Sequence, residues 1–146
     1  MRVVRVVPVL LGVALQVAAI GAAQDEGFTV VVNAANPVTS LPRAQVSRLF
    51  LKGVTEWPNG KRVIPVDLGH ASTVRESFSL AIHGRKTIAV KSYWQRMIFL
   101  GSAVPAIELE SDEAVLAFVR AQPRAVGYVS PGTPLPAEVK VLQISD

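Results

Sequence analysis

Short segments rich in β-branched residues alternate with segments of helical periodicity after residue 24, and this alternation limits the fold more than any other feature of the sequence. Gly, Pro and Asn-Gly residues separate the segments, as is typical of turns. The order β-α-β-α-α-β-α-β-β predicts the α/β class, as a three-layer α/β sandwich around a mixed sheet. The predicted strands cover about residues 28–32, 62–67, 106–109, 126–129 and 139–144, and the predicted helices cover about 42–52, 73–83, 87–99 and 112–121.

Capping residues set the expected helix boundaries. Ser40 is the predicted N-cap of the first helix and Gly53 its stop. Ser72 or Thr73 caps the second helix, and Ser111 caps the last. These signals place each helix directly after a strand or a turn.

The first 23 residues have the pattern of a secretory signal peptide. Arg2 and Arg5 precede an apolar run at 6–20, and the small residues 21–23 follow it. We therefore expect cleavage after Ala23, which divides the chain into a signal peptide at 1–23 and one domain at 24–146. The pattern predicts an exported, periplasmic protein.

A transmembrane anchor is the competing interpretation of the same apolar run. A membrane-spanning helix needs ~20 apolar residues, whereas this run is shorter and contains Pro8, Gly12 and Gln16. No cysteine follows the run, which excludes a lipid-anchored lipoprotein. We expect no membrane anchor after cleavage of the signal peptide.

The charge and the cysteine count exclude several classes of function. The chain has 15 Lys and Arg against 11 Asp and Glu, a net charge of +4 that falls to +2 without Arg2 and Arg5. No block of basic residues suggests nucleic acid as a partner. Because the chain has 0 cysteines, disulfides, thiol catalysis and cysteine-based zinc sites are excluded. The fold must therefore rest on its hydrophobic core.

The turn at 69–75 is the main candidate for a binding site. Ligands of α/β sheets bind at the C-terminal ends of strands, beside helix N-termini. Here Ser72 and Thr73 offer hydroxyl and backbone donors, and Arg75 offers a cation in the first helical turn, which is what an oxyanion needs. The alternative is purely structural: Thr73 and Glu76 have capping-box spacing, Glu76 would compete for the same N–H groups, and Arg75 would be solvated.

Asn33 is the second candidate, because it ends a predicted buried strand and its amide could face the same cleft. Its alternative role is turn formation. His70 lies close to the main turn, and His83 precedes Gly84, where a cation would complement the helix dipole. The two histidines form no metal motif, no nucleophile–base pattern is present, and no cofactor is indicated. We therefore expect a protein that is not an enzyme.

Five segments, in order, resemble the phosphate-binding proteins of ABC importers, of the PstS type. Residues 30–38, Val-Val-Val-Asn-Ala-Ala-Asn-Pro-Val, are similar to the hinge strand and turn of that family. The similarity continues with Leu-Phe-Leu-Lys-Gly at 49–53, Trp57 before a strand at 63–66, Arg-Glu-Ser-Phe at 75–78, and Ala-Val-Gly-Tyr-Val-Ser at 125–130. The resemblance implies one lobe of the periplasmic binding protein fold.

The sequence departs from the family in its phosphate loop and in its length. Residues 72–74 read Ser-Thr-Val where the family has Ser-Gly-Thr, and the arginine that precedes this serine in the family is absent. The receptors are about twice as long, because they close two lobes on the ligand. Both departures should weaken phosphate binding, since an anion must be paired when it is desolvated.

The resemblance implies a periplasmic solute-binding-like protein that takes phosphate or a similar small oxyanion, with an ABC permease as partner. The implied ligand-binding residues are Asn33, Ser72, Thr73 and Arg75. An alternative of another class is a ligand-free interaction module that keeps the fold within a cell-envelope complex. That alternative predicts an exposed apolar patch larger than a few hundred Å², where the absent second lobe would pack.

Overall fold

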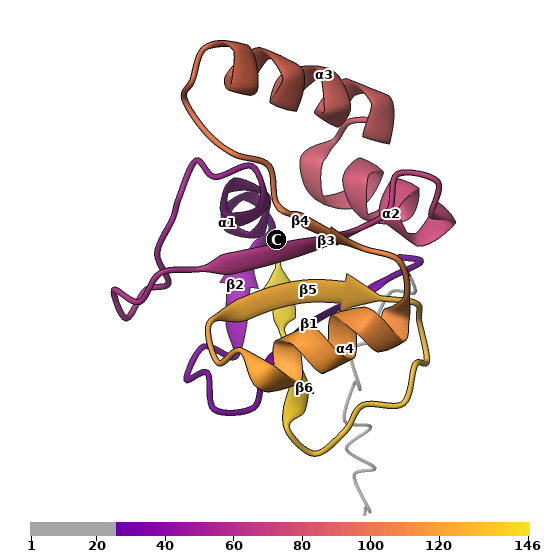
Figure 1. The fold of residues 1–146 in the computed structure, drawn as a ribbon. Helices are drawn as coiled ribbons and strands as arrows, with labels where there is room; N and C mark the ends of the chain where they lie inside the picture. Colours follow the sequence, from indigo (N-terminus) through magenta and orange to yellow (C-terminus); the bar gives the residue numbers. More distant parts are fainter. Residues whose placement is uncertain (1–25) are drawn as a thin grey trace, which may run out of the picture.

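A computed structural model describes residues 26–146, and the predicted signal peptide with its cleavage site lies outside the described residues. Strands and helices alternate along the described chain nearly as the sequence predicts (Figure 1). The elements are β1 (Thr29–Asn33), β2 (Ser40–Pro42), α1 (Arg43–Phe50), β3 (Ile64–Leu68), α2 (Thr73–Phe78), the π-helical turn η1 (Ser79–His83), α3 (Thr87–Phe99), β4 (Ile107–Leu109), α4 (Asp112–Ala121), β5 (Ala125–Val129), β6 (Val139–Val141) and β7 (Gln143–Ser145).

Five strands form a mixed sheet in the order β4-β3-β5-β1-β6. Strand β3 is parallel to β4 and β5, whereas β1 is antiparallel to β5 and β6. Thr29 lies opposite Val129, and Val32 lies opposite Val126. We call the end where β3, β4 and β5 finish the C-terminal end of the sheet. The opposite, N-terminal end is where β3 and β5 begin and β1 finishes.

Helices cover both faces of this sheet. On one face the Tyr128 ring stacks on Phe78 with centroids 3.9 Å apart, and Phe78 packs edge-on against Phe50 of α1. The preceding residue of β5, Gly127, faces α4, where a Cβ atom would lie 2.7 Å from a methyl group of Val115. In Figure 1, α4 lies in front of β5 and α1 lies behind the sheet. The predicted three-layer α/β fold is confirmed.

The first helix begins and ends differently from the prediction. Ser40 does not cap it, because Ser40–Pro42 form β2, which pairs in parallel with β7 and buries Leu41. Helix α1 begins at Arg43, and its N-cap, Pro42, makes no side-chain cap. At the other end, Lys52 rather than Gly53 takes a positive φ, of 56°.

The predicted strand at 139–144 is two strands in two sheets. Strand β6 pairs with β1, whereas β7 pairs with β2 in a separate two-stranded sheet. Leu142 lies between them, buried, and its N–H donates to the Val30 carbonyl 2.9 Å away. The other boundaries agree with the sequence: Ser111 caps α4, and Gly84 ends η1 with a φ of 64°. No helix among residues 26–146 is long and apolar enough to cross a bilayer.

Candidate functional site

The turn between β3 and α2 lies at the C-terminal end of the sheet, where the sequence predicts a ligand. The Gly69 N–H donates to the Leu109 carbonyl of β4 at 3.1 Å, and the Ser72 N–H donates to the Gly69 carbonyl at 2.9 Å. The turn is therefore attached to β4 and closed on itself, and both bonds fix the entry into α2.

Ser72 is the N-cap of α2. Its hydroxyl oxygen accepts a hydrogen bond from the Arg75 N–H at 3.2 Å, and its carbonyl accepts from the Glu76 N–H at 3.2 Å. Within residues 26–146, the N–H groups of Thr73 and Val74 have no acceptor. Because N–H groups at a helix N-terminus attract anions, this pair, with the exposed Thr73 hydroxyl, forms the donor set of the turn.

Glu76 does not compete for these N–H groups, which corrects the structural alternative. Its carboxylate accepts a hydrogen bond from the Thr87 N–H at 2.9 Å and so caps α3. The capping box that the spacing of Thr73 and Glu76 suggests is absent, because the Glu76 side chain points toward the next helix. The donors of the turn are left open.

Arg75 is buried, with 5% of its surface exposed. One guanidinium nitrogen donates to a Glu108 carboxylate oxygen at 2.6 Å and to the Leu68 carbonyl at 2.9 Å, and the other lies 4.0 Å from Asp67. Burial alone would lower the pKa of Arg75, but Asp67 and Glu108 raise it above its ordinary value. The guanidinium is therefore charged, neither solvated nor free, and faces two carboxylates.

Asp67 and Tyr128 complete this buried cluster, which we define as Asp67, Arg75, Glu108 and Tyr128. The Tyr128 hydroxyl donates to Asp67 at 2.8 Å and accepts from the Leu68 N–H at 3.2 Å. Burial raises the pKa of Asp67, although Arg75 and Tyr128 oppose that change. Burial and the neighbouring Asp67 also raise the pKa of Tyr128, so its hydroxyl stays a donor. The cluster binds both polar backbone groups of Leu68, directly before the turn.

Sequence reasoning missed three of these four residues. The signal available was Asp67, an acidic residue within an otherwise apolar strand. A carboxylate at a buried strand position needs a cationic or hydrogen-bonding partner, and Arg75 lies in the first turn of the helix that follows. Glu108 and Tyr128 come from β4 and β5, whose adjacency to β3 only the sheet order gives.

Asn33 does not lie with the other three predicted site residues, which corrects the expected facing turn. It ends β1 and so lies at the N-terminal end of the sheet, because β1 runs antiparallel to β5. Its amide nitrogen donates to the carbonyls of Val119 and Arg120, both at 3.0 Å, and its oxygen accepts from the Ala35 N–H at 2.9 Å. These bonds attach α4 to β1 and form the turn, so the role observed is structural.

The two histidines differ in environment. His70 is exposed on the β3–α2 turn. His83 lies 2.7 Å from the Ser47 hydroxyl, and burial, with Arg85 and Arg75, lowers its pKa to about 4. His83 is therefore neutral near pH 7, and the expected cation at the end of this helix is absent. No group of three or more His, Asp or Glu in residues 26–146 could hold a metal ion.

Comparisons with known proteins identify the fold. No protein-family model and no curated protein matches the sequence. Among solved structures, an ABC-type phosphate transport receptor from Vibrio cholerae superimposes with a TM-score of 0.63 and 25% identity over 81% of this chain. The chain shares the fold of phosphate ABC-transporter substrate-binding proteins. The resemblance found in the sequence is thereby confirmed.

Two further structures agree. A phosphate ABC transporter substrate-binding protein with bound phosphate from Clostridium perfringens gives a TM-score of 0.65 at 17% identity over 81% of this chain, and PstS from Borrelia burgdorferi gives 0.55 at 9% over 82%. This chain spans less than half of each of the three proteins, 46%, 44% and 47%. The neighbours are binding proteins rather than enzymes.

Proposed function

We propose that this protein is a non-catalytic, periplasmic solute-binding protein whose ligand is phosphate or a similar small oxyanion, and that it serves ABC import. The observation that supports this proposal is the shared fold with phosphate transport receptors, at 25% identity to the one from Vibrio cholerae. The open donors of the β3–α2 turn lie at the sheet end where α/β folds bind ligands.

In this proposal Ser72 and Thr73 contact the oxyanion. The N–H groups of Thr73 and Val74 donate to it, together with the Thr73 hydroxyl and the Ser72 hydroxyl hydrogen. Arg75 contributes by fixing the turn through Leu68 rather than by direct pairing, because its guanidinium is already bound to Glu108 and Leu68.

We expect the affinity for phosphate to be modest. Glu108 is half exposed beside the turn, and a Glu110 carboxylate oxygen lies 3.6 Å from where a Cβ atom of residue 69 would stand. Like charges near a binding site disfavour an anion, and this repulsion weakens as salt screens it. Phosphate binding should therefore become relatively stronger at moderate ionic strength, in contrast to binding at a site built from cations.

The test is thermal unfolding of residues 24–146 with and without millimolar phosphate, with sulfate as the control. At tenfold excess over its dissociation constant a ligand adds about 1.4 kcal/mol of stability, which raises the Tm by several degrees for a domain of this size. Ser72→Asp keeps a good N-cap and places a negative charge where the oxyanion would lie. Ser72→Asn keeps the cap without the charge.

The proposal requires a phosphate-dependent rise in Tm that Ser72→Asp removes and Ser72→Asn largely preserves. Equal rises with sulfate would contradict phosphate selectivity. A rise that survives Ser72→Asp would place the oxyanion elsewhere on the molecule.

Export is a separate part of the proposal. We propose that residues 1–23 are removed as a signal peptide, which leaves the domain at 24–146. Mass spectrometry of the protein from the periplasmic fraction of an expressing bacterium should give an N-terminus at Gln24. Recovery of the chain with Arg2 and Arg5 still present, in the cytoplasmic fraction, would contradict it.

One observation favours the second candidate, a ligand-free interaction module of a cell-envelope complex. Large apolar side chains are exposed at the end of α3 and just after it: Phe99 at 88%, Leu100 at 62% and Val104 at 73%. This candidate predicts no phosphate-dependent change in Tm. It also predicts that Phe99→Ser changes the free energy of unfolding by less than about 0.5 kcal/mol, because the ring would pack on a partner rather than on its own core. A larger loss in denaturant unfolding would contradict it.

A further inference from the structure

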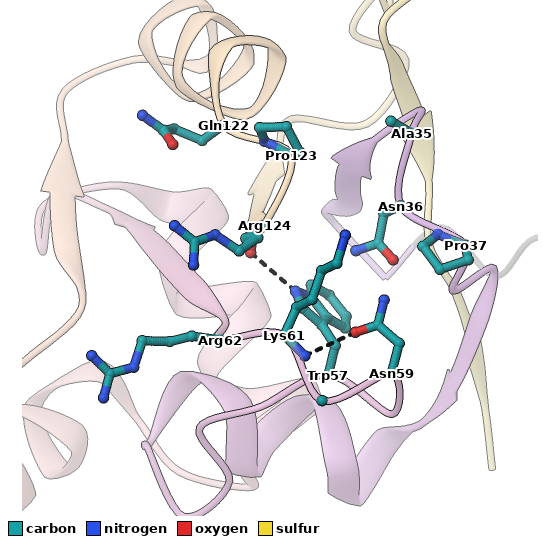
Figure 2. A pocket seen from close by; sticks show the side chains of 11 residues that line it. Ala35, Asn36, Pro37, Trp57, Asn59, Lys61, Arg62, Gln122, Pro123 and Arg124 are labelled. Atoms are coloured by element: carbon teal, nitrogen blue, oxygen red, sulfur yellow. Dashed lines mark hydrogen bonds between the residues drawn. The ribbon is translucent and has the colours of Figure 1, made fainter.

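A concave region lies at the N-terminal end of the sheet, opposite the β3–α2 turn. It is a cavity of about 600 Å³, formed where β1 ends and where β3 and β5 begin. Its lining comes from three separate loops, shown in Figure 2. We call it the basic pocket, and its lining residues are Ala35, Asn36, Pro37, Trp57, Asn59, Gly60, Lys61, Arg62, Gln122, Pro123 and Arg124.

Asn36 places an unpaired donor in the wall of the basic pocket. Its side chain is buried, at 4% exposure, and its amide oxygen accepts from the Val38 N–H at 2.9 Å. The backbone carbonyl oxygen of Asn36 accepts a hydrogen bond from the Lys140 ammonium. The amide nitrogen, by contrast, has no hydrogen-bond partner among residues 26–146. Because an unpaired buried donor is costly, this nitrogen indicates an acceptor supplied from outside the chain.

Two more donors face the same part of the pocket. The amide oxygen of Asn59 accepts from the Lys61 N–H at 3.0 Å, which turns the Asn59 amide nitrogen the other way. In Figure 2 the amide nitrogens of Asn36 and Asn59 and the ammonium of Lys61 point toward one region above Trp57. In both asparagines the oxygen is engaged by a backbone N–H, so the nitrogens are the atoms left to face a ligand.

The charge of the pocket is one-sided. Lys61, Arg62 and Arg124 line it and are exposed, and no acidic residue belongs to the lining. Within residues 26–146, no acidic side chain forms an ion pair with these three cations. Glu56 pairs with Arg62 only through the backbone, and Glu138 binds Arg120 at 3.1 Å. Trp57 forms a rigid floor, because its indole N–H donates to the Arg124 carbonyl at 3.0 Å.

We propose that the basic pocket binds a small organic oxyanion, a molecule that carries phosphate or carboxylate groups on a larger body. Anionic oxygens accept from Asn36, Asn59 and Lys61, and Arg62 and Arg124 attract further negative charge at the rim. A cavity of about 600 Å³ lies within the usual range for small-molecule sites. It has room for the organic body beside the charged group.

The test is a titration of ¹⁵N-labelled protein, residues 24–146, followed by NMR. Citrate is the carboxylate probe and glycerol 3-phosphate is the phosphate-ester probe, each against sodium chloride at the same ionic strength. We expect saturable shifts of the Asn36 and Asn59 side-chain amides and of the Trp57 indole. Saturation by either probe supports the proposal and names the charged group that the pocket prefers.

Two variants and a matched control locate the binding. Asn36→Asp keeps an acceptor for the Val38 N–H and replaces the free donor by a carboxylate oxygen, so affinity should fall at least tenfold. Lys61→Gln removes an exposed charge without affecting packing and should weaken binding severalfold. Lys91→Gln removes an exposed charge on α3, far from the pocket, and should leave the affinity unchanged.

Shifts no larger than those with sodium chloride, for both probes, would overturn the proposal, as would saturable binding that Lys61→Gln leaves unchanged. If Asn36→Asp fails to fold, Lys61→Gln still tests whether the probes bind at the basic pocket. Ser72→Asp should leave binding at the basic pocket intact, so this proposal and the proposed phosphate function can fail independently.

Discussion

The two ends of the central sheet handle positive charge in opposite ways. At the C-terminal end, the one arginine of the β3–α2 turn is buried and bound to Glu108 and Leu68, with Asp67 beside it. At the N-terminal end, three exposed cations line the same cavity as an unpaired amide donor, with no acid in the lining. A shared fold therefore fixes where loops lie, whereas individual side chains decide which loop presents free charge.

The largest expected effect comes from breaking the buried cluster. Arg75→Met leaves Asp67 buried without its cation, and we expect a loss of about 3 to 5 kcal/mol in the free energy of unfolding. Denaturant unfolding measures it. If the variant unfolds at the wild-type midpoint, Arg75 is not structural, and the contrast between the two ends disappears.

Two controls sharpen this result. Glu108 is half exposed, so Glu108→Gln should cost less than about 1 kcal/mol. The double variant Asp67→Asn with Arg75→Met removes both buried charges, so it should be more stable than Arg75→Met alone. The opposite ranking would show that Asp67 is not the group that Arg75 compensates.

Acid should destabilise the protein through His83, the last residue of η1. The folded-state pKa of His83 is about 4, below its ordinary value, so the unfolded chain binds the proton more readily and stability falls as the pH drops from 6.5 to 4. The loss is on the order of 3 kcal/mol. His83→Asn keeps an acceptor for the Ser47 hydroxyl and removes the titration. Its Tm should depend less on pH across this range, and an unchanged slope would contradict the assignment.

Gly127 lies in β5, the strand that runs from the N-terminal end to the C-terminal end of the sheet. A Cβ atom there would stand 2.7 Å from Val115 and 2.8 Å from Val66, both fully buried. Gly127→Ala should therefore cost about 1–3 kcal/mol through overpacking. Thermal unfolding checks it, with Gly53→Ala as a control, where the nearest atom is 3.7 Å away. Equal losses in the two variants would point to backbone effects instead of packing.

The smallest effect is expected at the basic pocket. Lys61→Gln and Arg124→Gln remove exposed cations with no ion pair among the described residues, so each should change the free energy of unfolding by less than about 0.5 kcal/mol. Neutralising them should also reduce the binding of citrate. A loss above 1 kcal/mol would show that these charges hold the fold, as Arg75 does at the other end.

Local patterns predicted the fold well, because capping and periodicity depend on neighbours in sequence. Helix α3 has the predicted bounds, and Ser111 caps α4 as expected. The failures involve distant partners. Ser40 reads as a helix cap until β7, a hundred residues later, pairs with it.

The position of the candidate site could be predicted from the sequence, but the roles of its residues could not. The strand–turn–helix order located Ser72 and Arg75. No local pattern shows that β4 brings Glu108 to Arg75. Asn33 was assigned to the wrong end because the sequence does not reveal that β1 runs antiparallel to β5.

The pairing of β6 and β7 with β1 and β2 has a consequence for how the chain is made. Residues 139–145 supply partners for strands that a ribosome releases about a hundred residues earlier. Until that last segment emerges, β1 lacks one neighbour and β2 lacks its only partner in the two-stranded sheet, and unpaired strand edges invite association with other chains. A nascent chain, or one clipped by a protease near residue 138, should therefore be prone to aggregate.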